Sequence, residues 1–143
     1  MNIPSQLPKK LHDLYLAAEK ARKNAYAPYS KFKVGAAIRL DCGRIFASSN
    51  IENVVNGASV CAERGAIQAI MSELGRVEMT EVLVVTDGSP PAAPCGVCRQ
   101  VLTEFVPKGR DLDIHTVNPK GEILSTTLRA LFPHAYTPDY VEH

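Results

Sequence analysis

The chain has 143 residues, of which 45% are hydrophobic and 22% are charged. This composition is typical of a globular protein and predicts one domain spanning residues 1–143. The 16 basic and 15 acidic residues give a net charge of +1, so composition does not support binding of nucleic acid, which usually needs a basic surface. No apolar run approaches the roughly 20 residues of a membrane span, and the N-terminus lacks a secretory signal. We therefore expect no membrane partner and a cytoplasmic location.

The first third of the chain predicts a helix followed by a hairpin. Apolar side chains recur at helical spacing from about Gln6 to Asn24, which predicts an amphipathic helix. Two strands are expected next, over Phe32–Leu40 and Arg44–Glu52, joined by a Gly-containing turn. Cys42 lies in this turn, and we interpret it as a small turn or core thiol.

The rest of the chain alternates between helices and strands. The predicted elements are a helix over Cys61–Leu74 that ends at Gly75, a strand over Glu81–Thr86, a helix over Cys95–Phe105, strands over Asp113–Val117 and Glu122–Ser125, and a short helix over Thr127–Leu131. Alternation of this kind is typical of an α/β fold, in which helices pack on the faces of a mixed sheet.

Three cysteines have the spacing of a metal site. Cys61 opens the second predicted helix, and Cys95 and Cys98 form a CxxC at the start of the third. Thiolates are the ligating form, and a helix N-terminus favours negative charge. Three sulfurs are one ligand short of a closed structural zinc site. The spacing therefore predicts one Zn²⁺ per subunit with a fourth position for water, whose pKa zinc lowers to about 7.

Charged residues follow each group of cysteines. Glu63 lies two residues after Cys61, where a carboxylate can take a proton from the water and pass it to a substrate nitrogen. A helix start with His or Cys followed two residues later by Glu, together with PCxxC, is the general signature of zinc deaminases, and this chain has the cysteine form. Arg64 and Arg99 are candidates to donate to a ligand sulfur and withdraw charge from it, and Arg64 is the first choice.

Two simpler interpretations compete with a catalytic zinc. A redox dithiol needs neither the third cysteine nor the CxE motif. A structural zinc needs a fourth protein ligand, yet none of the four histidines has ligand spacing to either cysteine group. A non-enzymatic zinc protein remains a third alternative.

Four motifs resemble those of the small zinc-dependent cytidine deaminases. They are Ala25–Ala37 (AYAPYSKFKVGAA), Asn50–Asn53 (NIEN), Cys61–Arg64 (CAER) and Pro94–Gln100 (PCGVCRQ). The motifs follow the family order, and the similarity runs from about Leu11 to Tyr136. The resemblance implies a three-layer α-β-α fold with a mixed five-stranded sheet. It also implies hydrolysis of cytidine and 2′-deoxycytidine to the uridines and ammonia, as in pyrimidine salvage.

The resemblance also implies roles for individual residues. Phe32 matches the residue that packs on the pyrimidine ring, and Asn50 and Glu52 match the pair that binds the ribose hydroxyls. Ala62 matches the position whose backbone lies against the base, and Arg64 matches the donor to zinc-bound sulfur. Small members of the family are usually homotetramers in which neighbouring subunits complete each active site, so we expect the same assembly. The resemblance also implies a small nucleoside as the substrate.

Two positions depart from the family pattern. Asn56 stands where a tyrosine usually lines the site, and Tyr136 stands where a phenylalanine usually stacks. These changes touch the substrate wall and leave a modified cytosine nucleoside such as blasticidin S as an alternative substrate. A polynucleotide-editing deaminase is a further alternative, but that class typically has histidine in place of Cys61 and needs a basic channel.

Overall fold

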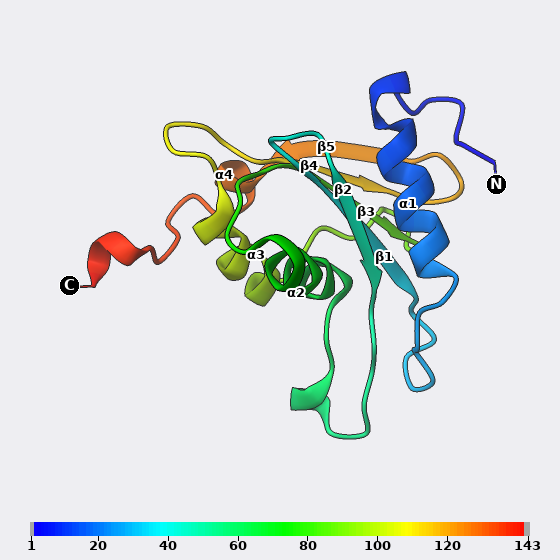
Figure 1. Ribbon diagram of the computed structural model, residues 1–143. Helices are drawn as coiled ribbons and strands as arrows, with labels where there is room; N and C mark the ends of the chain where they lie inside the picture. The colour runs from blue at the N-terminus through cyan, green and yellow to red at the C-terminus, as the bar shows by residue number, and fades with distance from the viewer. Residues whose placement is uncertain (1, 142–143) are drawn as a thin grey trace.

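Nine helices and strands occur along residues 2–141, the part of the chain that the computed structural model describes (Figure 1). They are α1 His12–Arg22, β1 Val34–Leu40, β2 Ile45–Ser49, α2 Ala62–Leu74, β3 Met79–Thr86, α3 Gly96–Leu102, β4 Asp113–Val117, β5 Ile123–Thr127 and α4 Leu128–Leu131. Short 3₁₀ turns cover Lys9–Leu11, Asn56–Ala58, Thr103–Phe105 and Pro138–Tyr140. The predicted order of elements is confirmed.

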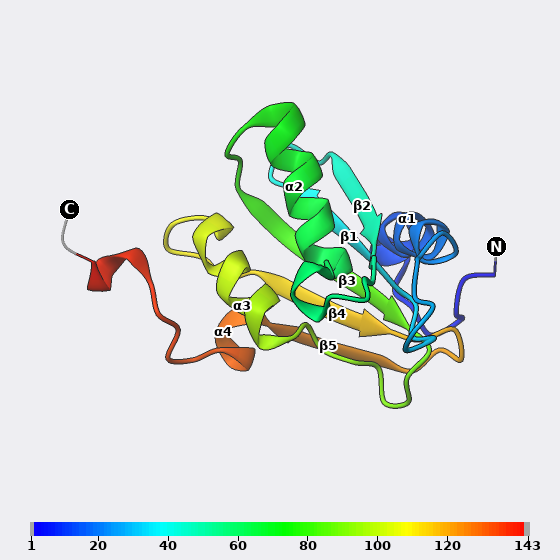
Figure 2. The same cartoon turned by 90° about the horizontal axis from the view of Figure 1, so that it is seen from below.

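The five strands form one mixed sheet in the order β2-β1-β3-β4-β5. Only β3 and β4 pair in parallel, while the β1–β2, β1–β3 and β4–β5 pairs are antiparallel. Helix α1 covers one face of the sheet, and α2 and α3 lie on the other (Figures 1 and 2). The three-layer α-β-α fold with a mixed five-stranded sheet is therefore confirmed.

The alternation of side chains along the strands divides the core in two. On β3, Val82 and Val84 belong to the apolar cluster under α2 and α3, and Leu83 and Val85 belong to the cluster under α1. Because successive strand residues point to opposite faces, a continuous apolar run is the expected sequence of a strand that is covered on both sides. Among residues 2–141, no helix combines the length and apolar character that crossing a bilayer requires.

The first helix is shorter than predicted. It begins at His12 after a 3₁₀ turn, whereas the sequence predicts a start at Gln6. Pro8 has extended geometry with ψ of 142°, and a proline disfavours the helical region for the residue before it. Leu7 is nevertheless buried in the same apolar cluster as Leu11 and Leu14. The apolar face was therefore correctly predicted, but Leu7 lies before the helix and its 3₁₀ turn rather than within the helix.

Several other boundaries differ from the prediction: β1 begins at Val34 rather than Phe32, and β5 covers Ile123–Thr127 rather than Glu122–Ser125. The second strand ends at Ser49, because the Asn50 side chain then bonds to the backbone of the preceding segment. The third helix tightens into a 3₁₀ turn after Leu102. Strand β3 starts two residues earlier than predicted, at Met79. Cys42 lies exposed in the β1–β2 turn, which agrees with a turn thiol rather than a core thiol.

Two glycines allow the helices to approach the sheet closely. A Cβ at Gly35 on β1 would overlap the carbonyl oxygen of Ala18 on α1. A Cβ at Gly65 on α2 would overlap the hydroxyl of Ser48 on β2. Each helix layer therefore packs against the sheet through a position where only hydrogen fits.

Replacement of Gly35 by alanine tests this close approach. We expect Gly35→Ala to lower the free energy of unfolding by about 2–3 kcal/mol, because an added methyl in a filled space forces the backbone apart. The matched control is Gly57→Ala, where no atom lies within 4 Å of the added Cβ and the expected change is within about 0.5 kcal/mol. Urea unfolding at one protein concentration measures both, and equal midpoints for the two variants would contradict the packing.

Candidate active site

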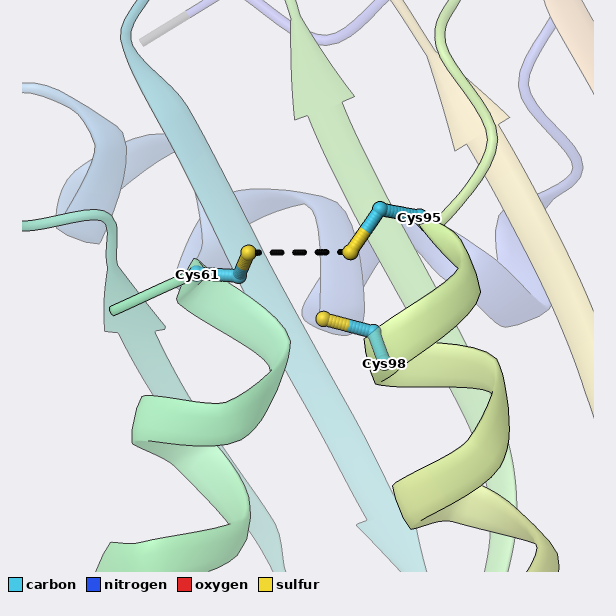
Figure 3. A group of neighbouring side chains, drawn as sticks. All are labelled: Cys61, Cys95 and Cys98. Atoms are coloured by element: carbon cyan, nitrogen blue, oxygen red, sulfur yellow. Dashed lines mark hydrogen bonds between the residues drawn. The ribbon is translucent and has the colours of Figure 1, made fainter. Parts of the chain in front are cut away.

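The three predicted cysteine ligands converge on one point. Their Sγ atoms all lie within 4.8 Å of one another, and Cys61 Sγ is 3.8 Å from Cys95 Sγ. Figure 3 shows the sulfurs directed toward one another from the starts of α2 and α3. Two sulfurs bound at about 2.3 Å to a tetrahedral zinc lie about 3.8 Å apart. The sulfur geometry therefore fits a zinc ion.

The local backbone explains why the sulfurs meet. Cys61 and Cys95 are both N-cap residues with extended backbone, at ψ of 152° and 169°. Arg99 holds the second of these helix starts, because its Nε donates to the Pro94 carbonyl at 2.7 Å and its Nη1 to the Leu131 carbonyl at 2.9 Å. The sequence had allowed Arg99 to donate to a ligand sulfur. Its guanidinium instead bonds two backbone carbonyls and joins the CxxC segment to α4.

The surroundings of the cysteines favour a thiolate. Hydrogen bonds from Cys98, and then from Arg64 and Cys95, lower the pKa of Cys61 to about 5. The bond to Cys61 and burial raise the pKa of Cys98 in turn. One negative charge is therefore stable among these thiols before any metal binds, and a metal would replace the remaining protons.

Arg64 is the cation beside this charge. Its Nη2 donates to Cys61 Sγ at 3.6 Å, and its Nε is buried without a hydrogen-bond partner among residues 2–141. The thiolates raise the pKa of the guanidinium, first through the bond to Cys61. Three thiolates and one Zn²⁺ carry a net charge of −1, so a guanidinium at this distance suits the charge of a loaded site.

Glu63 lies in the first turn of α2 and is 96% buried, with 4% of its surface exposed. Burial raises its pKa, and the neighbouring charge of Cys61 raises it further. A raised pKa is common among carboxyl groups that act as general acids or bases in enzyme sites. Glu63 is therefore a buried carboxyl group with a raised pKa beside the sulfurs.

A cavity of about 210 Å³ opens over the cysteines. Its walls are mostly apolar, and the lining residues are Phe32, Val34, Asn50, Cys61, Ala62, Glu63, Val84, Thr86, Ala92, Ala93 and Cys95. It lies at the carboxyl end of β3, where ligands commonly bind in open α/β sheets. Four predicted residues beyond the ligands, namely Phe32, Asn50, Ala62 and Glu63, thus share one cavity.

Asn50 and Glu52 hold the segment that carries Phe32. The Asn50 amide donates to the Phe32 carbonyl at 2.9 Å and accepts from the Val34 N–H at 2.9 Å. Glu52 accepts bonds from the backbone of Tyr29 and from both the backbone and the hydroxyl of Ser30, and it does not line the cavity. Both side chains therefore position the aromatic wall, a function that the sequence does not reveal.

Tyr136 and Asn56 lie away from the cavity of their own chain. Tyr136 is exposed and stacks on Tyr140, with ring centroids 5.6 Å apart. It belongs to the segment after α4, which leaves the body of the fold in both views (Figures 1 and 2). Asn56 is exposed on the long β2–α2 connection, which also projects from the sheet (Figure 1). Neither residue lines the cavity over the cysteines in its own chain.

A group of hydrogen bonds that the sequence did not predict joins the loop after β3 to the turn between β4 and β5. Asn118 is fully buried, and its amide donates to the Gly88 carbonyl and to Glu122 Oε1, each at 3.0 Å. Ser89 donates to the same Glu122 oxygen at 2.6 Å. These bonds fix the segment that leads to Ala92 and Ala93 of the wall. The Asn-Pro turn was predicted, but its contact with a segment 30 residues earlier has no local signal.

Comparison with known proteins agrees with this site. Residues 8–109 match the family model described as the cytidine and deoxycytidylate deaminase zinc-binding region. The chain belongs to the cytidine and deoxycytidylate deaminase family. The resemblance noted in the sequence motifs is thereby confirmed, as is the expectation of zinc.

Individual relatives cover most of the chain. A cytidine deaminase of Halalkalibacterium halodurans is 41% identical over 122 residues, which are 85% of this chain and 90% of the relative. The crystal structure of cytidine deaminase from Burkholderia pseudomallei has a TM-score of 0.81 and 39% identity, covering 87% of this chain and 98% of that one. A blasticidin-S deaminase of Bacillus cereus is 31% identical over 116 residues, which are 76% of this chain and 79% of the relative.

Proposed function

We propose that the protein is a zinc-dependent hydrolase that deaminates cytidine and 2′-deoxycytidine to uridine and 2′-deoxyuridine with release of ammonia. The observation that carries this proposal is the buried carboxyl of Glu63 in the same small cavity as Cys61 and Cys95. Zinc held by three thiolates supplies a Lewis acid that makes water a nucleophile near neutral pH. The other steps belong to the residues of the chain.

Glu63 carries the protons in this mechanism. Its carboxylate takes a proton from the attacking water and delivers it to N3 of the base. The same carboxyl then moves the proton of the new C4 hydroxyl to the exocyclic amine. The C4–N bond breaks as the C4 carbonyl forms, so one water is consumed and one ammonia is released. The raised pKa of Glu63 favours this exchange, and burial excludes competing water.

The walls of the cavity suit a single pyrimidine ring. Phe32 offers an aromatic face, and Ala62 is buried at the start of α2. We assign recognition of the ribose hydroxyls to Asn50 and Glu52. Each side chain bonds the backbone of the Tyr29–Val34 segment and would bind the ribose with its remaining donor or acceptor capacity. The cavity of about 210 Å³ suits one base, and the net charge of +1 gives no support for a polynucleotide substrate.

A cytosine-bearing antibiotic nucleoside is the second candidate substrate. The similarity to a blasticidin-S deaminase and the departures at Asn56 and Tyr136 favour this alternative. An ultraviolet assay over cytidine, 2′-deoxycytidine, deoxycytidine monophosphate, cytosine, adenosine and blasticidin S separates the candidates. We expect turnover of the first two, and inactivity on both would contradict the proposal.

The role of Glu63 is tested in the same assay. We expect Glu63→Gln to lower kcat on cytidine by about 10²–10⁴-fold, because the amide cannot move the proton. Zinc content should remain that of the wild type. The matched control is Glu73→Gln, an exposed position on the same helix, which should keep full activity.

The two arginines beside the cysteines have separable roles. Arg64 donates to a sulfur, so Arg64→Gln should retain zinc but lower kcat, since the thiolates then keep more charge and weaken the Lewis acid. Arg99 holds the backbone around Cys95, so Arg99→Gln should raise the zinc dissociation constant by about 10- to 100-fold. Metal analysis after dialysis against a chelator, together with kcat, distinguishes the two. A wild-type kcat in Arg64→Gln would refute its tuning role.

The assembly that we propose is a cytoplasmic homotetramer acting in pyrimidine salvage, with one catalytic domain per subunit. Support comes from the two projecting segments that carry Asn56 and Tyr136, because neither residue lines the cavity of its own chain. The β2–α2 connection also exposes Val54 and Val55, at 76% and 62%, and exposed apolar residues of this kind mark contact surfaces. Tyr136 would then stack on the base bound by a neighbouring subunit.

Co-expression of two impaired variants tests this sharing of sites. Loss of one aromatic stack should lower kcat/KM of Tyr136→Ala by about 10- to 100-fold. When Tyr136→Ala and Glu63→Gln subunits are co-expressed, a mixed site can combine Glu63 of one chain with Tyr136 of another, so activity should exceed that of both parents together. Phe32→Ala co-expressed with Glu63→Gln is the control, because both residues line the same chain's cavity. Absence of recovery with Tyr136→Ala would contradict the shared site.

A further inference from the structure

A second group of potential metal ligands lies at the other end of the parallel strand pair. Glu81 on β3 and Asp113 and His115 on β4 have their ligand atoms within 4.8 Å of one another. Glu81 is in register with Asp113, and all three residues lie on the α1 face, because they alternate with Val82 and Ile114 of the opposite core cluster. The catalytic cavity includes Thr86, at the opposite end of β3.

The His115 ring is the feature that points to a ligand. Its side chain is 91% buried, with 9% exposed. Its Nδ1 lies 2.8 Å from the Ser125 hydroxyl, while its Nε2 is shielded from solvent and makes no hydrogen bond within residues 2–141. That Nε2 lies 3.4 Å from Glu81 Oε2. In the tautomer that donates from Nδ1 to Ser125, the Nε2 lone pair faces Glu81 Oε2, and a cation bound between the two atoms would stabilise that arrangement.

The neighbours of the group hold it in a ligating orientation. Arg39 Nε donates to Glu81 Oε1 at 2.9 Å, which leaves Oε2 facing the imidazole. The Arg39 guanidinium is itself held by Asp13 through two bonds of 2.8 and 3.0 Å, so Asp13 offsets its positive charge. A histidine fixed through its second nitrogen and a carboxylate fixed through its second oxygen are the usual outer contacts of protein metal ligands.

We propose that Glu81, Asp113 and His115 form a second site for a divalent transition-metal ion, distinct from the three-cysteine site. The 3.4 Å between His115 Nε2 and Glu81 Oε2 is close to the roughly 3.3 Å expected between two ligands bound at about 2.0–2.1 Å to a tetrahedral metal. Asp113 is exposed at the start of β4, so the ion can enter from solvent. Water would complete the coordination.

The ligand set indicates the class of ion. One imidazole nitrogen and two carboxylates suit Zn²⁺, Co²⁺ or Ni²⁺ better than Mg²⁺ or Ca²⁺, which prefer oxygen ligands alone. The ion would join β3 to β4 on the face of the sheet that also carries α1, which packs on β1, β2 and β3. It would therefore stabilise the sheet and take no part in the chemistry of the cavity.

Metal titration of the zinc-loaded enzyme tests the site. Equilibrium dialysis against Zn²⁺ or Co²⁺, followed by metal analysis, should give two equivalents per chain for the wild type. His115→Gln and Asp113→Asn should each weaken binding of the second equivalent by at least about 10-fold while keeping the first equivalent and the wild-type kcat. Asp113 is exposed at a strand end, so Asp113→Asn tests the site even if His115→Gln fails to fold.

Matched controls and a spectroscopic measurement make the result decisive. His134→Gln and Asp139→Asn change the same residue types at exposed positions and should bind two equivalents. Bound Zn²⁺ should shift the ¹⁵N resonance of His115 Nε2, and the shift should saturate with the second equivalent. Retention of one equivalent by the wild type, or equal binding by all four variants, would overturn the proposal. So would a His115 ring that stays protonated on both nitrogens throughout the titration, since it would then form only an ion pair with Glu81.

Discussion

The site depends on two helices whose first residues are brought to the same point of the sheet. Helix α2 begins after Cys61 and α3 after Cys95, and the extended backbone at each cysteine directs its sulfur into the space between the helices. The 3.8 Å between these sulfurs is set by the fold, so a metal finds its ligands already in place. Such a preformed site loses little conformational entropy when it binds.

This placement requires a sheet that both layers of helices can approach closely. Gly35 lets α1 rest on β1, and Gly65 lets α2 rest on β2. The wall of the cavity also depends on polar side chains that form hydrogen bonds with the backbone. Asn50 and Glu52 hold the turn that ends at Phe32 in this way. Lys31 in that turn has a φ of 62°, an unusual value for a residue with a side chain. The bonds from Asn50 and Glu52 offset the cost of that conformation and fix the direction of Phe32.

The sequence predicts those features that have a local signal. Element order follows from apolar periodicity, and the cysteines and Glu63 follow from spacing within single helix starts. The predicted start of α1 was wrong, because apolar residues at helical spacing continue to the N-terminal side of Pro8 while the helix begins only at His12. The backbone roles of Asn50, Glu52 and Asn118 could not be predicted, since each joins segments that are distant in sequence. For the same reason a pattern of residues cannot show whether Tyr136 lines its own cavity or another chain's, because the answer depends on where the terminal segment leaves the fold.

The same limit applies to the group of Glu81, Asp113 and His115, whose members are separated by up to 34 positions and meet only through the register of β3 with β4. Two metal sites at opposite ends of one strand pair would not compete, because their ligands differ in chemistry. Thiolates select soft or borderline ions and hold zinc tightly, whereas an imidazole with two carboxylates binds it more weakly and exchanges it with other divalent ions. An arginine donates to one ligand at each site, Arg64 to Cys61 and Arg39 to Glu81, but the charge of Arg39 is offset by Asp13. Occupancy of the second site would therefore follow the supply of metal, while the catalytic zinc would remain bound.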